Sequence, residues 1–243
     1  MSQNIIDIKF EELDSKVYRI VPVEYLFNLF ESRENVLVHP RKWSDPFENF
    51  ILNSPFRLSN GKVVNNSRRE SFFAQCWSTK SQSDALWRLY SHKSGTVRIR
   101  TTIRRLIDGL ISSVGVDAQD CAFIGRVRYF SKAKLLAHAQ TFFPNGVNPT
   151  NRHFANTLLF KRSAFTHEAE IRLLFFDYEG MATDIYRYSV DPLTLVDDIL
   201  IDPRVNRAVA EKLANKIRNR LSFTGRIVRS NLYDLPPKIQ ISF

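Results

Sequence analysis

The sequence predicts an α+β fold, and two features of its hydrophobic pattern lead to this prediction. Short segments rich in β-branched and aromatic residues, typical of strands, are interspersed with amphipathic segments of helical period. The two kinds of segment do not alternate regularly, as they would in the strand–helix–strand units of a parallel sheet. The predicted strands cover residues 17–21, 35–39, 72–77, 95–101, 123–130, 171–177, 185–190, 199–202 and 226–230.

Apolar residues at helical spacing predict helices over 24–33, 84–92 and 103–114. A further helix is predicted after Asp202, which would be its N-cap, with Pro203 in the first position. Its apolar stripe would consist of Val205, Val209, Leu213 and Ile217. Residues 43–48 are expected to form an aromatic-rich turn around an Asp-Pro bend, and 53–70 and 142–151 are expected to be loops.

Length and composition indicate a single domain over residues 1–243. A chain of this length with 44% hydrophobic residues can bury one core, and nothing in it requires a second. No apolar run is long enough to span a membrane, and the acidic start of the chain is unlike a signal peptide, so we expect a cytoplasmic protein. Cys76 and Cys121 have no companions that would complete a zinc site, which predicts two reduced thiols.

The charge of the chain favours a polyanionic partner. There are 35 Lys and Arg residues against 25 Asp and Glu residues, so the net charge is +10. A field of this sign concentrates nucleic acid near the protein, and the basic residues recur along the whole chain rather than in one tail. We therefore expect RNA or DNA as a partner, although each basic pair taken alone is also typical of a solvated surface.

A pair of carboxylates stands out in the segment His167-Glu168-Ala169-Glu170-Ile171-Arg172, which leads into an apolar run. In a strand, side chains alternate between faces, so Glu168, Glu170 and Arg172 are expected to project from one side. Two adjacent acids are costly to maintain for structure alone. Such a pair suits catalysis in which one acid stabilises developing positive charge and the other orients the attacked group.

The order of three short motifs resembles that of a known enzyme superfamily. Arg19 lies on the first predicted strand, Ser78-Thr79 at the end of a middle strand, and Glu168-Ala169-Glu170 at the start of a later one. This order resembles the Arg, Ser-Thr-Ser and Glu-x-Glu motifs of the arginine-serine-glutamate branch of the ADP-ribosyltransferase superfamily. The chain departs from the pattern at Lys80, where the superfamily prefers serine.

A second resemblance covers nearly the whole chain. The chain is similar to a large bacterial family known only as a domain of unknown function. The matching landmarks are Tyr18-Arg19, Trp43-Ser44-Asp45-Pro46-Phe47-Glu48, Cys76-Trp77-Ser78, Leu86-Trp87-Arg88-Leu89-Tyr90 with Gly95, Lys161, and Glu168-Ala169-Glu170-Ile171-Arg172. More distantly, the chain resembles the DarT-like toxins, which modify nucleic acid.

These resemblances imply an ADP-ribosyltransferase-like split β-sheet core flanked by helices, with NAD as the cosubstrate. By resemblance, Glu170 is the catalytic acid and Glu168 orients the acceptor. Arg19 would contact the NAD phosphate or ribose, and Ser78 would support Glu170 or the nicotinamide ribose. The other residues expected to bind the cofactor are Thr79, Asp45, Trp87 and Tyr90, the last two by stacking, as Trp43 or Phe47 also could.

Several alternatives stay open. Arg19 could form a structural salt bridge with Glu168 or Glu170, the aromatic residues could belong to the core, and Asp45 could cap its turn. A metal-dependent nuclease would use Asp45, Glu48, Glu168 and Glu170 around Mg²⁺, but the Asp/Glu-x-Lys pair of such nucleases is missing from that strand, and we expect no metal site. A non-catalytic nucleic-acid-binding module would explain the charge but not the paired acids.

The sequence hypothesis is therefore an NAD-dependent ADP-ribosyltransferase that acts on nucleic acid, with RNA favoured over DNA or protein. By analogy with the family, such an enzyme belongs to a toxin–antitoxin or phage-defence system and has an antitoxin partner.

Overall fold

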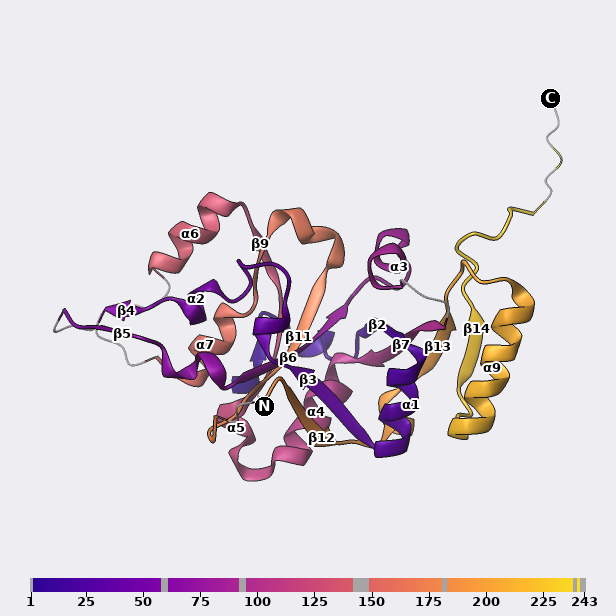
Figure 1. Cartoon of the computed structure of the whole chain (residues 1–243), viewed down its shortest axis with the longest axis horizontal. Coiled ribbons are helices and arrows are strands. Elements are labelled where there is room, and N and C mark those ends of the chain that lie inside the picture. Colours follow the sequence, from indigo (N-terminus) through magenta and orange to yellow (C-terminus); the bar gives the residue numbers. More distant parts are fainter. Residues whose placement is uncertain are drawn as a thin grey trace.

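The computed structural model describes residues 2–57, 61–91, 95–141, 149–180, 183–237 and 240. Its centre is a ten-stranded mixed sheet (Figure 1). Eight of the strands follow one path, in the order β1 (Ile5–Ile6), β8 (Ala122–Arg126), β11 (Glu170–Phe176), β6 (Phe72–Ser78), β2 (Lys16–Pro22), β7 (Thr96–Thr102), β13 (Asp198–Ile201) and β14 (Arg226–Arg229). The α+β class is confirmed.

The sheet splits at β6. On one edge, β6 pairs with β11 along its whole length, from Phe72 opposite Phe176 to Ser78 opposite Glu170. On its other edge, β6 meets β3 (Glu34–Val38) only at Ala74 and β2 only at Ser78. Beyond these contacts β3 pairs with β12 (Ile185–Ser189), while β2 pairs with β7, so the two strands diverge. The split-sheet core implied by the resemblance is therefore present.

Two small sheets lie beside the central one. β9 (Arg128–Phe130) pairs with β10 (Phe160–Arg162), and β4 (Phe56–Arg57) pairs with β5 (Val63–Val64). The single strand predicted over 123–130 is thus wrong, because the chain leaves β11 after Val127, whose N–H donates to the Glu170 carbonyl, and then joins β10. The stretch predicted as a loop over 53–70 contains β4, β5 and a 3-10 turn, Ser67–Glu70. Of the loop predicted over 142–151, residues 142–148 lie outside the described residues.

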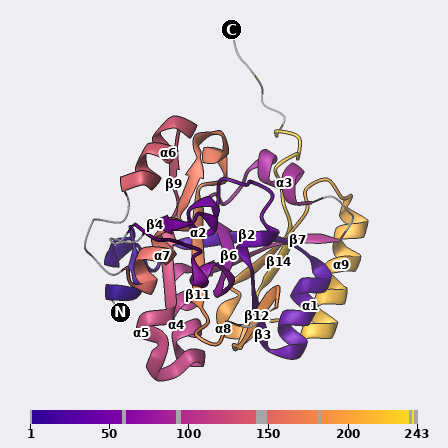
Figure 2. The same ribbon diagram turned by 60° about the vertical axis from the view of Figure 1, so that its left-hand side comes forward.

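Helices flank the sheet. They are α1 (Val23–Ser32), α2 (Phe50–Asn53), α3 (Asp84–Tyr90), α4 (Ile103–Val114), α5 (Ala118–Cys121), α6 (Lys132–Thr141), α7 (Asn151–Thr157), α8 (Pro192–Leu195) and α9 (Arg207–Leu221). In Figures 1 and 2, α3 lies above the sheet and α4 below it, and in Figure 1 α6 and α9 lie at opposite ends of the molecule. The sequence does not predict α6, because the helix buries a single side chain, Leu135, and so shows no apolar stripe.

The last helix begins later than its sequence predicts. Asn206, not Asp202, is the N-cap of α9, because its side chain accepts a hydrogen bond from the Val209 N–H at 2.9 Å. The buried stripe is also shifted, to Ala210, Ala214, Ile217 and Leu221, and Val209 is 42% exposed. Small alanines let α9 pack closely on the sheet, which a search for large apolar residues overlooks.

A continuous hydrophobic core surrounds the middle strands. All seven residues of β11 are buried, among them Glu170 and Arg172. Buried charges are costly unless they are paired, so residues near the start of β11 have to supply partners for Glu170 and Arg172. Among the described helices, none is long and apolar enough to cross a membrane.

Candidate active site at the split of the sheet

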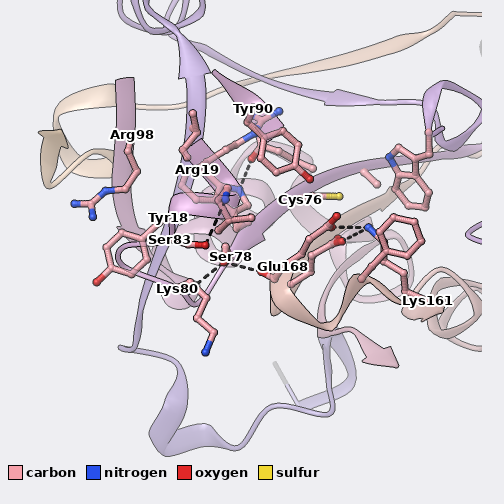
Figure 3. Close-up of a pocket in the computed structure, with 18 of the residues that line it drawn as sticks. Tyr18, Arg19, Cys76, Ser78, Lys80, Ser83, Tyr90, Arg98, Lys161 and Glu168 are labelled. Atoms are coloured by element: carbon pink, nitrogen blue, oxygen red, sulfur yellow. Dashed lines mark hydrogen bonds and ion pairs between the residues drawn. The ribbon is translucent and has the colours of Figure 1, made fainter. Parts of the chain in front are cut away.

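A cavity of about 380 Å³ opens where β2 and β3 diverge from β6. Strand β2 contributes Tyr18, Arg19 and Ile20 to its wall, and β6 contributes residues 74–78. Helix α3 adds Trp87 and Tyr90, and the carboxylates of Glu168, Glu170 and Glu48 lie in the lining with Lys161 (Figure 3). The cavity therefore joins most of the motifs that are far apart in the sequence.

Glu48, Glu168 and Glu170 form one side of the cavity, which we call the acidic wall, and Lys161 on β10 lies at its centre. Its Nζ is 2.6 Å from Glu168 Oε2, 2.5 Å from Glu170 Oε1 and 3.2 Å from Glu48 Oε1. The lysine and the three carboxylate side chains are each less than a tenth exposed. In this environment charge pairs interact more strongly than they do in water.

Arg172 on β11 supports the same wall through Glu170 and Glu48. Its guanidinium is fully buried, donates to Glu170 Oε2 at 2.8 Å and to the Leu158 carbonyl at 2.6 Å, and also binds Glu48. It lies 4.2 Å from the centre of the Trp43 ring. These contacts form a cluster of three carboxylates and two cations: Glu48, Glu168, Glu170, Lys161 and Arg172. When every group is ionised, the cluster carries one net negative charge.

Glu168 and Glu170 meet in a way that strand alternation does not describe. β11 begins at Glu170, while Glu168 ends the 3-10 helix Ser163–Glu168, so the prediction that both acids project from one strand is wrong. Ala169 between them has a left-handed backbone with φ of 45°. Ser78 Oγ donates to the Glu168 carbonyl at 2.6 Å, and Thr79 N–H donates to the Ala169 carbonyl at 3.0 Å, which anchors this bend to β6.

The two acids differ in proton affinity. Burial, and then the hydrogen bond that it shares with Glu170, raise the pKa of Glu168 to about 7. Burial also acts to raise the pKa of Glu170, but the charges of Arg172 and Lys161 and the hydrogen bond with Glu168 outweigh it and hold this pKa below the usual range. Glu170 is therefore the ionised member of the pair, and Glu168 is the member that exchanges a proton near neutral pH.

Arg19 projects from β2 into the same cavity, and it is only partly exposed. In the part of the chain that the structure describes, its guanidinium forms no ion pair or hydrogen bond, so the alternative of a salt bridge with Glu168 or Glu170 is not observed. Burial lowers the pKa of Arg19, although it stays a cation at neutral pH. A partly buried, unpaired guanidinium is a good site for an anionic ligand group.

The other predicted residues lie in different surroundings. Ser78, Trp87 and Tyr90 line the cavity, where Trp87 is 1% exposed and Tyr90 is 48% exposed. Thr79 is not among the lining residues and binds the Ala169 carbonyl through backbone and side chain. Asp45 is also outside the lining: its carboxylate accepts from the Phe47 N–H at 3.0 Å and pairs with Arg162 at 2.9 Å, which is the turn-capping alternative.

Sequence reasoning missed the roles of Lys161, Arg172 and Tyr129. Lys161 appears as a family landmark without a role, and Tyr129 OH accepts the Glu170 N–H at 2.9 Å. Strand alternation places Arg172 on the same face as Glu170, but no spacing rule connects Lys161 and Tyr129 with them, because β9 and β10 reach the site only through tertiary pairing.

The arrangement does not favour the metal-dependent nuclease. The ammonium group of Lys161 lies between Glu48, Glu168 and Glu170, in the position that a cation shared by them would need, and Asp45 pairs with Arg162 instead. No group of three or more His, Cys, Asp or Glu side chains suited to a metal ion occurs within the described ranges.

No protein-family model matches the chain, and no curated protein matches it in sequence. Its structure is similar to solved structures of DarT from Thermus sp. 2.9. The complex of that protein with NAD+ aligns with a TM-score of 0.38 and 12% identity, over 89% of this chain and 96% of that one. Its complex with ADP-ribosylated ssDNA aligns with a TM-score of 0.41 and 9% identity, over 89% and 94% of the two chains. At this level of similarity the site has to be interpreted from its own residues.

Proposed function

We propose that the chain is an NAD-dependent ADP-ribosyltransferase that modifies nucleic acid. The observation that supports this proposal is the cavity at the split of the sheet. One wall has Arg19, a cation with no ion pair among the described residues, and another has the Glu168–Glu170 pair. Its volume, about 380 Å³, is within the range of small-molecule pockets, roughly 300–1,000 Å³.

The residues fit NAD through charge and shape. Arg19 would bind a phosphate of the pyrophosphate, since a guanidinium matches phosphate geometry. Tyr90 on α3 would hold a flat ring, because it lines the cavity and is half exposed, whereas Trp87, which is 1% exposed, offers little surface for stacking. When bound, NAD supplies an electrophilic ribose carbon from which nicotinamide departs.

The acidic wall would stabilise the transition state. Positive charge develops at the ribose carbon as the bond to nicotinamide lengthens, and fixed carboxylates lower the energy of such charge. When Glu168 is ionised, the carboxylates outnumber the cations by one and the wall carries the required sign. Lys161, Arg172 and the Ser78 contact hold it in place, so little reorganisation is needed during the reaction.

The acceptor that we propose is nucleic acid, with RNA ahead of DNA or protein. The net charge of +10 supports a polyanion, and Lys80 is exposed at the cavity with no ion pair among the described residues. We also propose that the enzyme acts as a toxin in the cytoplasm, in a toxin–antitoxin or phage-defence setting, and is controlled by an antitoxin protein.

The test is incubation with NAD labelled in the adenosine part and separate pools of RNA, DNA and protein. We expect release of nicotinamide and a gain in mass of the nucleic acid. Strand scission that requires Mg²⁺ would instead indicate a nuclease, and a stable complex without turnover would indicate a binding module. The double variant Glu168→Gln/Glu170→Gln serves as the inactive control.

A further inference from the structure

The contacts of Lys161 and Arg172 determine how firmly each carboxylate of the acidic wall is held. An ammonium group has three N–H donors, and Lys161 directs its Nζ at Glu48, Glu168 and Glu170. Glu170 is held through both oxygens, by Lys161 at 2.5 Å and by Arg172 at 2.8 Å. Glu48 is likewise held by both cations. Glu168 is held by one cation, Lys161, through Oε2 at 2.6 Å, and it shares a hydrogen bond with Glu170.

We infer that Lys161 is a positioning residue of this site: together with Arg172 it immobilises Glu170 as the stabilising charge, and it orients Glu168, which it alone of the two cations holds, to take the proton of the acceptor. This inference rests on the proposed function. It assigns Lys161, Arg172 and Glu48 to the support of the reacting pair, and it separates the roles of the two acids by their contacts rather than by their order in the chain.

The electrostatics agree with this division. The charged groups that face Glu168 and Glu170 are Lys161 from β10, Arg172 from β11, and Glu48 from the turn before α2. The remaining titratable neighbours stay neutral at pH 7: burial raises the pKa of Cys76 and of Tyr129 to about 12 and that of Tyr90 further above its usual range. Lys161 lowers the pKa of Glu168 against the opposing effect of burial, so loss of the lysine charge would raise that pKa.

The transfer exchanges one bond to the ribose carbon for another and moves one proton to Glu168. The lone pair of the acceptor atom forms the new bond to the ribose carbon, and the bond from that carbon to nicotinamide breaks with its electrons leaving on nicotinamide. The proton of the acceptor N–H or O–H passes to the ionised Glu168 and then to solvent. Lys161 stays protonated throughout, because the three carboxylates raise its pKa in spite of burial.

Two measurements test the inference, and one of them does not require turnover. In protein with ¹³C-labelled glutamate side chains, one buried carboxyl that is lost in Glu168→Gln should titrate near pH 7. In Lys161→Met this titration should move up by roughly 1–3 pH units, the usual effect of removing an opposite charge at close range. The acid limb of the pH–rate profile should move by the same amount, whereas Lys161→Arg should keep the limb near its original pH while reducing kcat.

A charge-balanced variant guards against loss of folding. Lys161→Met/Glu48→Gln removes one cation and one anion, so the cluster keeps its net charge while Glu168 and Glu170 still lose the lysine. The matched control is Lys212→Met, which removes an exposed lysine of α9 and should change neither titration nor rate.

The inference would be overturned if the double variant folded and Glu168 titrated as in the unmodified protein. A titration at the ordinary carboxyl pKa in the unmodified protein would overturn it too. If the titration shifts as expected but NAD is not consumed, the positioning role stands and the proposed function fails.

Discussion

At the scale of single residues, the two sides of the cavity differ in how their charges are compensated. Every charged group of the acidic wall has at least one partner, whereas Arg19 has no ion pair among the described residues. The desolvation of Arg19 is therefore a cost to the free protein, and a ligand that supplies an anion would remove it.

Arg19→Ala should weaken NAD binding by about 1.5–3 kcal/mol, because a charge-assisted contact to phosphate is lost. The melting temperature should stay the same or rise, since no ion pair is broken and an unpaired cation is removed. Calorimetric titration with NAD and a thermal melt measure both effects, and Arg226→Ala, an exposed arginine on β14, is the control. Unchanged NAD affinity with a collapsed melting temperature would give Arg19 a structural role instead.

Glu170→Gln should slow transfer by roughly 10²-fold or more, about 3 kcal/mol in the barrier, since the stabilising charge is lost. The sequence alone predicts little change in stability, but the contacts with Lys161 and Arg172 predict a loss of up to about 3–5 kcal/mol, because one partner of a buried ion pair disappears. Single-turnover rates well below the unfolding transition, together with urea denaturation, separate the effects. Glu211→Gln on the surface of α9 is the control, and full activity in Glu170→Gln would end the catalytic assignment.

At the scale of elements, the structure shows which local signals were sufficient. α4 begins and ends as predicted, because Thr102 caps it and Ile103, Leu106, Ile107 and Leu110 form a stripe that is wholly buried. The start of α9 was mispredicted because Asp202-Pro203 imitates a helix start, whereas Asp202 is buried and binds Ser91 and Arg204. A cap is decided by the backbone around it, which the residue type alone does not specify.

Asn206→Ala should therefore destabilise the protein by about 1 kcal/mol, within the range of roughly 0.5–2 kcal/mol for loss of an N-cap. Equilibrium unfolding in urea measures this change. Asn219→Ala is the matched control, because Asn219 lies exposed inside α9 and caps nothing, so its loss should cost no stability. Equal effects of the two substitutions would contradict the observed start of the helix.

At the scale of the whole molecule, the net charge of +10 is distributed differently from what the sequence indicates. Many arginines that cluster in the sequence are neutralised in the structure, among them Arg98, Arg100, Arg104, Arg105, Arg126 and Arg128. Within the described ranges, Lys132 and Lys134 on α6 and Arg226 on β14 have no carboxylate partner. Contacts with nucleic acid are therefore expected from such unpaired cations, spread over the surface, rather than from the arginine pairs.

Binding to nucleic acid should weaken with salt, with a slope of log K against log [salt] of about −0.7 for each phosphate neutralised on a single strand. Fluorescence anisotropy with single-stranded RNA, single-stranded DNA and duplex DNA at several salt concentrations measures this slope. Lys132→Ala/Lys134→Ala should make it shallower by up to about 1.4 if both lysines contact phosphates. Modification in a lysate that survives nuclease but disappears with protease would instead identify a protein acceptor.

The sequence by itself determined the elements whose signals are local. The strands around Arg19, Ser78 and Glu170 and the helix α4 follow from hydrophobic period and capping. The order of the motifs along the chain identifies the candidate site residues. These signals act over a few residues, so they can be read without knowledge of the fold.

Only the tertiary structure decided how the charges are paired. Lys161 reaches Glu48, more than a hundred residues earlier in the chain, because β10 pairs with β9 and not with the central sheet. Arg19 has no ion pair in the described part of the chain, because β2 diverges from β3 and opens the cavity beside it. Ion pairing depends on distance and burial, and both are set by the packing of segments far apart in sequence.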